Sequence, residues 1–196
     1  MKRVISISML LLFAVSINSQ ISISKSQGGP MEIERFGSYI NKGSTLIREY
    51  ITLNDETCPL RISPDVGVEP GFLTKNKLWF TASGNIFPQK PIAAYEIHHI
   101  LYDVFGQHIK SLSNVEITDL ETPKSLEKDE FFERHISWQA FEHEASEYFY
   151  CISYVANVRT MEGEIWEFNL SKIMLEMDII QFPYEEDYLP LISLVE

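Results

Sequence analysis

Glutamate and histidine side chains concentrate in "ERHISWQAFEHEASE", residues 133–147. The titratable residues of interest are His135, Glu142, His143, Glu144 and Glu147. Zinc accepts imidazole and carboxylate donors, and His143 and Glu147 would share one face of a helix because they are four residues apart. The segment has no HExxH motif and no spaced Cys/His set, and an acidic chain places carboxylates near histidines by default. We interpret it as a solvated charged segment. A metal site, or a small hydrolase that takes its acid and base from this segment, is the alternative.

The adjacent histidines His98 and His99 lie in "AAYEIHHILYDVF", residues 93–105, which we expect to be extended. Side chains alternate along a strand, so the two rings point to opposite faces and cannot chelate one ion. Tyr95, Ile97 and Leu101 share the face of His99, which we take as the core face. We therefore expect His99 to be a hydrogen-bonded, partly buried imidazole and His98 to be exposed.

Three other groups could act as nucleophiles or acids. Ser83 and Gly84 lie in "TASGNIF", which lacks the GxSxG pattern of a serine hydrolase and is typical of a loop. Cys151 falls inside an expected strand, where nothing favours its thiolate. The carboxylate pairs Asp129–Glu130 and Glu185–Glu186 resemble solvated acidic loops more than glycosidase pairs. We assign no catalytic, cofactor-binding or metal-binding residue.

The chain contains two cysteines, Cys58 and Cys151, which are 151 − 58 = 93 residues apart. In an exported protein such a pair is first considered as a disulfide. Free cysteine is itself commonly buried, so a bridge and two buried thiols both remain open.

The order of apolar residues and turn residues predicts mostly strands. The run "STLIREYITLN" (44–54) fits either a helix, with Leu46, Ile47, Tyr50 and Ile51 on one face, or a strand, with Ile47, Ile51 and Leu53 on one face; we favour the strand because β-branched residues crowd its second half. After Pro59, glycine and proline recur too often for a long helix, and the short runs "LRIS" (60–63) and "KLWFTAS" (77–83) have strand character. The polar stretch at residues 122–147 is expected to leave the sheets and to form a short helix, with Trp138, Phe141 and Ala145 at helical spacing.

Two glycine turns predict two hairpins. In "YDVFGQH", residues 102–108, Gly106 can adopt positive φ, and Asp103 can accept backbone N–H bonds in the turn. The second hairpin joins "YFYCISYVANVRT" (148–160) to "EIWEF" (164–168) through Met161, Glu162 and Gly163. Alternation places Tyr150, Ile152, Tyr154, Ala156 and Val158 on one face, with Cys151 on the other. We expect Trp166 to be buried between sheets.

These hairpins carry a resemblance. The pairing of "PIAAYEIHHILYDVFGQHI" with "YVANVRTMEGEIWEF" resembles the Ig-like or fibronectin-like β-sandwich domains of exported bacterial proteins of unassigned function. The similarity covers Pro91 to Phe168. It implies an all-β, Ig-like antiparallel β-sandwich of about seven strands in a single domain, with one short helical excursion. The chain lacks the cysteine spacing of antibody domains, and no binding residue follows from the resemblance.

The ends of the chain suggest export. Met1, Lys2 and Arg3 precede the apolar run Val4–Val15, the order of a signal peptide, so we expect residues 1–19 to be removed and the product to be secreted or periplasmic. Residues 20–43 read as a flexible arm, 44–182 as the sandwich, and 183–196 as a C-terminal tail or edge strand. The apolar run is too short to favour a membrane anchor.

Charge and aromatic content narrow the class of function. The net charge of −12 becomes −14 once Lys2 and Arg3 are removed, which disfavours nucleic acid as a partner. Trp79, Trp138, Trp166 and nine tyrosines could supply stacking surface for a sugar or anchors for a protein, although most of them must fill the core. We expect a non-catalytic binding or accessory module that contacts a protein or glycan through exposed aromatics and sheet edges.

Overall fold

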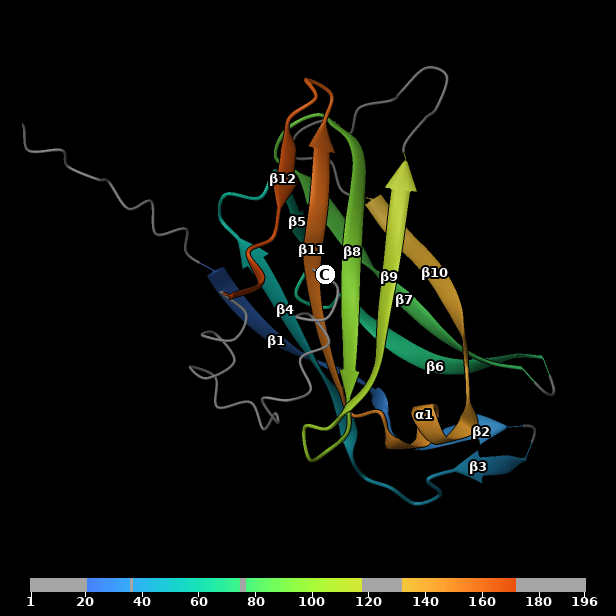
Figure 1. Ribbon diagram of the computed structural model, residues 1–196. Coiled ribbons are helices and arrows are strands. Elements are labelled where there is room, and N and C mark those ends of the chain that lie inside the picture. The colour runs from blue at the N-terminus through green and yellow to red at the C-terminus, as the bar shows by residue number, and fades with distance from the viewer. Residues whose placement is uncertain (1–20, 36, 75–76, 118–131, 172–196) are drawn as a thin grey trace, which may run out of the picture.

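The computed structural model describes residues 21–35, 37–74, 77–117 and 132–171 of the 196-residue chain, and it is mostly β-strand (Figure 1). The elements are β1 (Ile21–Pro30), β2 (Ile33–Arg35), β3 (Ser38–Ile40), β4 (Ile47–Asp55), β5 (Leu60–Ile62), β6 (Gly67–Thr74), β7 (Lys77–Pro88), β8 (Ile92–Tyr102), β9 (His108–Ile117), β10 (Phe132–Ala140), α1 (Glu142–Glu147), β11 (Tyr150–Thr160) and β12 (Ile165–Glu167). The expected all-β class is confirmed. The expected leader (1–19) and tail (183–196) lie outside the described residues.

The larger sheet has six strands in the order β1-β4-β11-β8-β9, with β12 also paired to β11. β4 and β11 run parallel, with Tyr150 opposite Glu49 and Tyr154 opposite Leu53. β12 lies further along the same edge of β11, where Val158 faces Trp166. The sheet is therefore mixed, whereas we expected purely antiparallel sheets. A parallel pair needs a long crossover, and the chain between β4 and β11 provides one.

The smaller sheet is organised around the long strand β7. β10 pairs with one edge of β7, while β5 and β6 follow one another along the other edge. Ser83 and Gly84 therefore lie within a strand, and the loop expected there was wrong. Gly84 has a φ of 148°, and a Cβ atom built on it would lie 2.3 Å from Cγ2 of Val66. The glycine permits this close approach of the backbone to Val66.

Trp138 is part of β10, where it lies opposite Phe80 of β7, so its expected place in a helix was wrong. The reason is a two-residue period: Ile136, Trp138 and Ala140 alternate with exposed Ser137 and Gln139. The expected helix does exist, but α1 begins only at Glu142. Within the described ranges, no helix is both long and apolar enough to cross a bilayer.

The two sheets pack face to face over two apolar clusters, and in Figure 1 the smaller sheet lies behind the larger one. One cluster includes Val68, Leu78, Phe80, Leu101, Leu112, Tyr148 and Cys151. The other includes Leu60, Ile62, Val66, Ile86, Ile97, Val155 and Val158. Both clusters draw on strands of each sheet, which is the arrangement of a β-sandwich.

Strand β8 is buried on both faces in its second half. Ile97, His99 and Leu101 are 0–2% exposed and point between the sheets, as the alternation predicted. Ile100 and Tyr102, on the opposite face, are also buried. They belong to a third cluster, which we call the outer cluster: Ile21, Ile51, Leu53, Ile100, Tyr102, Ile152, Tyr154, Ala156 and Phe168.

The expected flexible arm at residues 20–43 is wrong over its described part. Strand β1 pairs antiparallel with β4 from Ile21 to Pro30, and Ile21 is buried in the outer cluster. Gly28, one of the glycines that suggested a linker, is explained by packing. A Cβ atom on Gly28 would lie 2.5 Å from the buried Tyr50 ring, so a larger residue here would force the ring to shift.

The hairpin between β11 and β12 turns at Gly163, as expected. Its turn is closed by a hydrogen bond from the Gly163 N–H to the Thr160 carbonyl at 3.0 Å. Cys151 faces away from Ile152 and Tyr154, also as expected. The position of Val158 was wrong. A register shift between Val155 and Asn157 inserts one residue, so Val158 joins Val155 between the sheets.

Candidate functional site

The turn in "YDVFGQH" is a hairpin between β8 and β9, as predicted. Oδ1 of Asp103 accepts the N–H groups of Phe105 and Gln107, each at 2.8 Å. Gly106 has a φ of 82°, the left-handed conformation that glycine adopts without steric cost. Asp103 and Gly106 thus hold Val104 and Phe105 out at the tip, where Phe105 is 77% exposed.

This tip borders an open hollow of about 540 Å³ at one end of the sandwich. The other walls are the segment from β3 to β4 and the end of α1; in Figure 1 these elements surround the lower end of the sheets. The lining residues are Met31, Asn41, Lys42, Gly43, Ser44, Leu46, Asp103, Val104, Phe105, Ser146 and Glu147. The size of the hollow lies within the range of ligand pockets.

Sequence reasoning did not identify the hollow. It foresaw the turn at Asp103 and Gly106, but residues 31–43 had been placed in the flexible arm. The missed signal is Asn41, which has a φ of 53°, because asparagine is one of the few residues that adopt this conformation readily. Its side chain joins two walls by donating to the carbonyls of Met31 at 3.3 Å and Ser146 at 2.7 Å.

A buried arginine, Arg48, forms hydrogen bonds to three backbone segments near the hollow. Arg48 is 1% exposed, and its guanidinium donates to the carbonyls of Pro30, Ala145 and Tyr148. Burial lowers the pKa of Arg48, while the charge of Glu69, 3.7 Å away, opposes that shift. These bonds join the end of β1, α1 and the residue that follows α1, so they stabilise the adjoining end of the sandwich.

In the Glu/His-rich segment, Glu144 and His143 are engaged in contacts of their own. Both carboxylate oxygens of Glu144 accept from Nζ of Lys110 at 2.9 Å, and Oε2 also accepts the Phe141 N–H at 3.0 Å. His143 is exposed and stacks on Phe141, with 5.9 Å between ring centroids. Glu144 therefore anchors the start of α1 to β9.

Glu142 and Glu147 are exposed, and the side chain of His135 lies outside the part of the chain that is described. Among the described residues, no three His, Cys, Asp or Glu side chains are placed to hold one metal ion. The carboxylate pairs Asp129–Glu130 and Glu185–Glu186 also lie outside that part.

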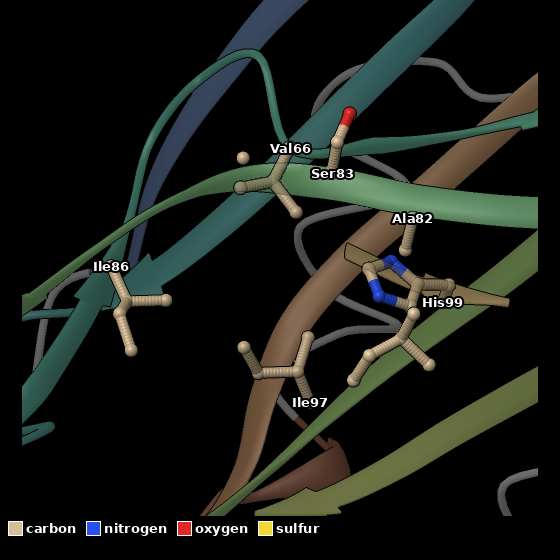
Figure 2. A pocket seen from close by; sticks show the side chains of 8 residues that line it. Val66, Ala82, Ser83, Ile86, Ile97 and His99 are labelled. Atoms are coloured by element: carbon tan, nitrogen blue, oxygen red, sulfur yellow. The ribbon is translucent and has the colours of Figure 1, made fainter. Parts of the chain in front are cut away.

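His99 borders a cavity between the sheets (Figure 2). The cavity measures only about 10 Å³, the space of a single water molecule, and is lined mainly by apolar side chains such as Ile97 and Ile86. Nδ1 of His99 lies 2.8 Å from Oγ of Ser153, which donates to the Val66 carbonyl at 3.3 Å. Ser153 is fully buried, so this pair satisfies polar groups in the core and has no room for a substrate.

His98 was expected to be exposed, but it is half-buried and has two partners. Its Nε2 lies 2.8 Å from a carboxylate oxygen of Glu96, and its Nδ1 lies 3.2 Å from the hydroxyl of Tyr154. Burial alone would raise the pKa of Glu96, but hydrogen bonds from His98 and Asn157 bring it below its usual value. The expectation failed because Tyr154, next to His98 on β11, supplies a partner that alternation cannot show. As predicted, His98 and His99 face opposite sides of the sheet.

Cys58 and Cys151 are both free and buried. They belong to different clusters between the sheets, so the disulfide that the sequence left open is not formed. Burial raises the pKa of Cys58 to about 12 and that of Cys151 to about 11. Neither thiol has the lowered pKa of a cysteine nucleophile.

The three tryptophans are half-buried. Trp166 was expected between the sheets, but it lies at their margin, touches two clusters, and donates from Nε1 to the hydroxyl of Thr57 at 3.1 Å. Trp138 packs beside His99 and donates to the Ser113 carbonyl at 3.2 Å. These hydrogen bonds and contacts assign Trp138 and Trp166 to the frame of the sandwich, and the most exposed aromatic among the described residues is Phe105.

No family model, curated protein or solved structure matches this chain.

Proposed function

We propose that this chain is an exported, non-catalytic binding module, secreted or periplasmic, whose Ig-like β-sandwich frame presents the end hollow to a protein partner. The observation that carries the proposal is the exposure of Phe105 on a hydrogen-bonded turn beside that hollow. Phe105 is 77% exposed and Leu46, on another wall, is 49% exposed. Exposed apolar side chains gathered around a concave surface mark interaction sites.

A protein partner fits the hollow better than a glycan does. Sugar recognition needs several side-chain donors and acceptors aimed into the site. The Asp103 carboxylate is already bonded to two backbone N–H groups, and the Asn41 amide is bonded to two carbonyls. The surface that the hollow offers to a ligand is largely apolar, and exposed Lys42 and Glu147 are among its lining residues. Such a surface suits a protein partner that inserts an apolar side chain surrounded by polar groups.

The alternative of a small hydrolase receives less support from the structure. Glu144 is held by Lys110 and by the start of α1, while Glu142 and Glu147 are exposed. A general base is expected near a cavity that can hold a substrate. The cavity beside His99 measures about 10 Å³, and the lining residues of the larger end hollow include Glu147 but no histidine to act with it. The proposal therefore rests on the hollow.

Export and charge complete the proposal. The order Lys2, Arg3 and Val4–Val15 is that of a cleaved signal peptide, and the −12 net charge disfavours a nucleic-acid partner. N-terminal sequencing of the exported protein should find a start within a few residues of Gln20. A start at Met1 would contradict the export step.

The partner can be tested by placing a photoreactive amino acid at position 105 of the full chain in its native host. Ile165 is the matched control, because it is 65% exposed and lies on β12, at the other end of the larger sheet from the β8–β9 turn. We expect a discrete protein adduct from position 105, absent from position 165 and lost when Leu46→Asp is added. No adduct at 105, the same adduct at both positions, or an adduct that only a glycosidase removes would refute the proposal.

A further inference from the structure

The outer cluster lies on the face of the larger sheet that points away from the smaller sheet. On β4, Thr52 and Tyr50 reach the smaller sheet, where they donate to the carbonyls of Ser63 and Val68. Alternation sends Ile51 and Leu53, which lie between and beside them, to the opposite face. The same holds for Ile152 and Tyr154 on β11, since Cys151 packs between the sheets.

This outward face is buried. Ile51, Leu53, Ile100, Ile152 and Tyr154 are each 1% exposed or less. Within the described ranges, Ile23 and Tyr150 pack against it from strands of the same sheet, and Trp166, Phe168 and Leu170 reach it from the chain after β11. These residues lie beside the cluster, and none of the described helices or strands makes a substantial set of contacts across it. A face of isoleucine, leucine and tyrosine this deeply buried needs a cover, because exposing that area to water is unfavourable.

The path of the chain after β12 points to the cover. The Phe168 N–H still donates to the Ala156 carbonyl at 2.9 Å, so residue 168 continues the edge beside β11. The next place on that edge belongs to β4, where Leu53 lies opposite Tyr154. The chain must therefore leave the sheet. It leaves on the outer side, because Phe168 packs on Tyr154, 4.9 Å between ring centroids, and Leu170 packs on the outer cluster.

The sequence that follows has the required composition. Beyond Ser171 the printed chain continues for 196 − 171 = 25 residues, which could extend over roughly 80 Å at about 3.3 Å per residue. Its first part is strongly apolar: Ile173, Met174, Leu175, Met177, Ile179, Ile180 and Phe182. The acidic run Glu185–Asp187 comes only after these residues, so the stretch nearest the exit point is the one suited to an apolar face.

We propose that residues 172–182 of the same chain bind across the outer cluster and form the third layer of the molecule. The outer face is then an intramolecular docking surface, separate from the end hollow. The two other candidate covers are a second copy of the chain and the residues before Ile21. Neither has the continuity that Phe168 and Leu170 provide.

The first test uses the unmodified full chain. Hydroxyl-radical footprinting read by mass spectrometry should modify Ile179, Ile180 and Phe182 several-fold less than Leu191 and Ile192, and the protection should not change on dilution. Equal modification of the two groups would overturn the proposal, and protection that disappears on dilution would assign the cover to a second copy.

The second test compares two charge pairs in the full chain: Ile179→Asp with Ile180→Asp, and the control Leu191→Asp with Ile192→Asp. Only the first should bare the outer cluster, raising binding of an apolar dye while the far-UV circular dichroism stays that of a β protein. Adding a synthetic peptide of residues 172–184 should reverse the dye binding. If the first pair binds no more dye than the control pair, the proposal is wrong.

Discussion

Removing the Asp103 carboxylate tests whether the "YDVFGQH" turn is a rigid support. In Asp103→Ala, the Phe105 and Gln107 N–H groups each lose an acceptor at 2.8 Å. A neutral hydrogen bond contributes about 0.5–1.5 kcal/mol net, and one to a charged group about twice as much. Asp103 is half-exposed, so water replaces part of each bond. We expect a total loss of roughly 2 kcal/mol, which in a domain of this size lowers Tm by about 4–8 °C.

The assay is urea denaturation followed by far-UV circular dichroism, with thermal unfolding in parallel. Asp103→Asn is the matched control, because its Oδ1 can still accept both N–H groups without the charge, and it should lose about half as much stability. Gly106→Val should cost about 1–3 kcal/mol, since a β-branched residue is strained at a φ of 82°. Phe105→Ala, which removes an exposed ring, should stay within about 0.5 kcal/mol of wild type.

The outcomes of these assays distinguish a structural role of the turn from a role in partner binding. If Asp103→Ala left the denaturation midpoint unchanged but abolished partner binding, Asp103 would be a contact residue and the assignment of its carboxylate to the turn would be refuted. If Phe105→Ala lowered stability as much as Asp103→Ala, the exposed tip would be part of the fold. The expected pattern is the reverse: Asp103 affects stability, and Phe105 affects binding.

Two further predictions concern the space between the sheets. Gly84→Ala should lower the free energy of unfolding by at least about 2 kcal/mol in urea denaturation, because of backbone strain at a φ of 148° and overpacking against Val66. The control Gly71→Ala, whose Cβ would meet open space, should stay within about 0.5 kcal/mol of wild type. Equal denaturation midpoints for the two variants would contradict the close approach of Gly84 to Val66. Because burial raises the pKa of Cys58 to about 12 and of Cys151 to about 11 from an ordinary value of 9.0, neither thiol should react with a disulfide reagent at pH 8 until the protein unfolds. The unfolded thiols ionise first, so the free energy of unfolding should fall as the pH rises from 9 to 10, and by less in the Cys58→Ala, Cys151→Ala variant; rapid labelling of the folded protein would disprove this burial.

Predictions based on local periodicity or turn chemistry were largely confirmed. "AAYEIHHILYDVF" and "YFYCISYVANVRT" alternate clearly enough to identify β8 and β11 as strands. Gly106 and Gly163 mark the two hairpin turns, because each turn needs a residue that tolerates positive φ. These preferences act over a few residues, so a single sequence displays them.

Predictions that depended on distant partners failed. Gly28 suggested a linker because nothing nearby in sequence shows the Tyr50 ring that a larger residue there would force to shift. Val158 changed faces because of a one-residue register shift against β8, and a bulge arises from the pairing of two strands. The hollow was missed for the same reason, since its walls come from residues 31–46, 103–105 and 146–147.

The sequence by itself determined that this chain forms short strands, where two of its turns lie, and that its charge is strongly acidic, because propensity, alternation and composition are properties of neighbouring residues. Tertiary structure alone decided which strands became neighbours, including the parallel pair β4–β11. It also decided that Arg48 is buried under three carbonyls, that two histidines have partners on β11, and that Phe105 stands beside a hollow. Each of these features joins residues tens of positions apart, and their contact becomes favourable only when the whole core forms and repays the entropy of ordering them.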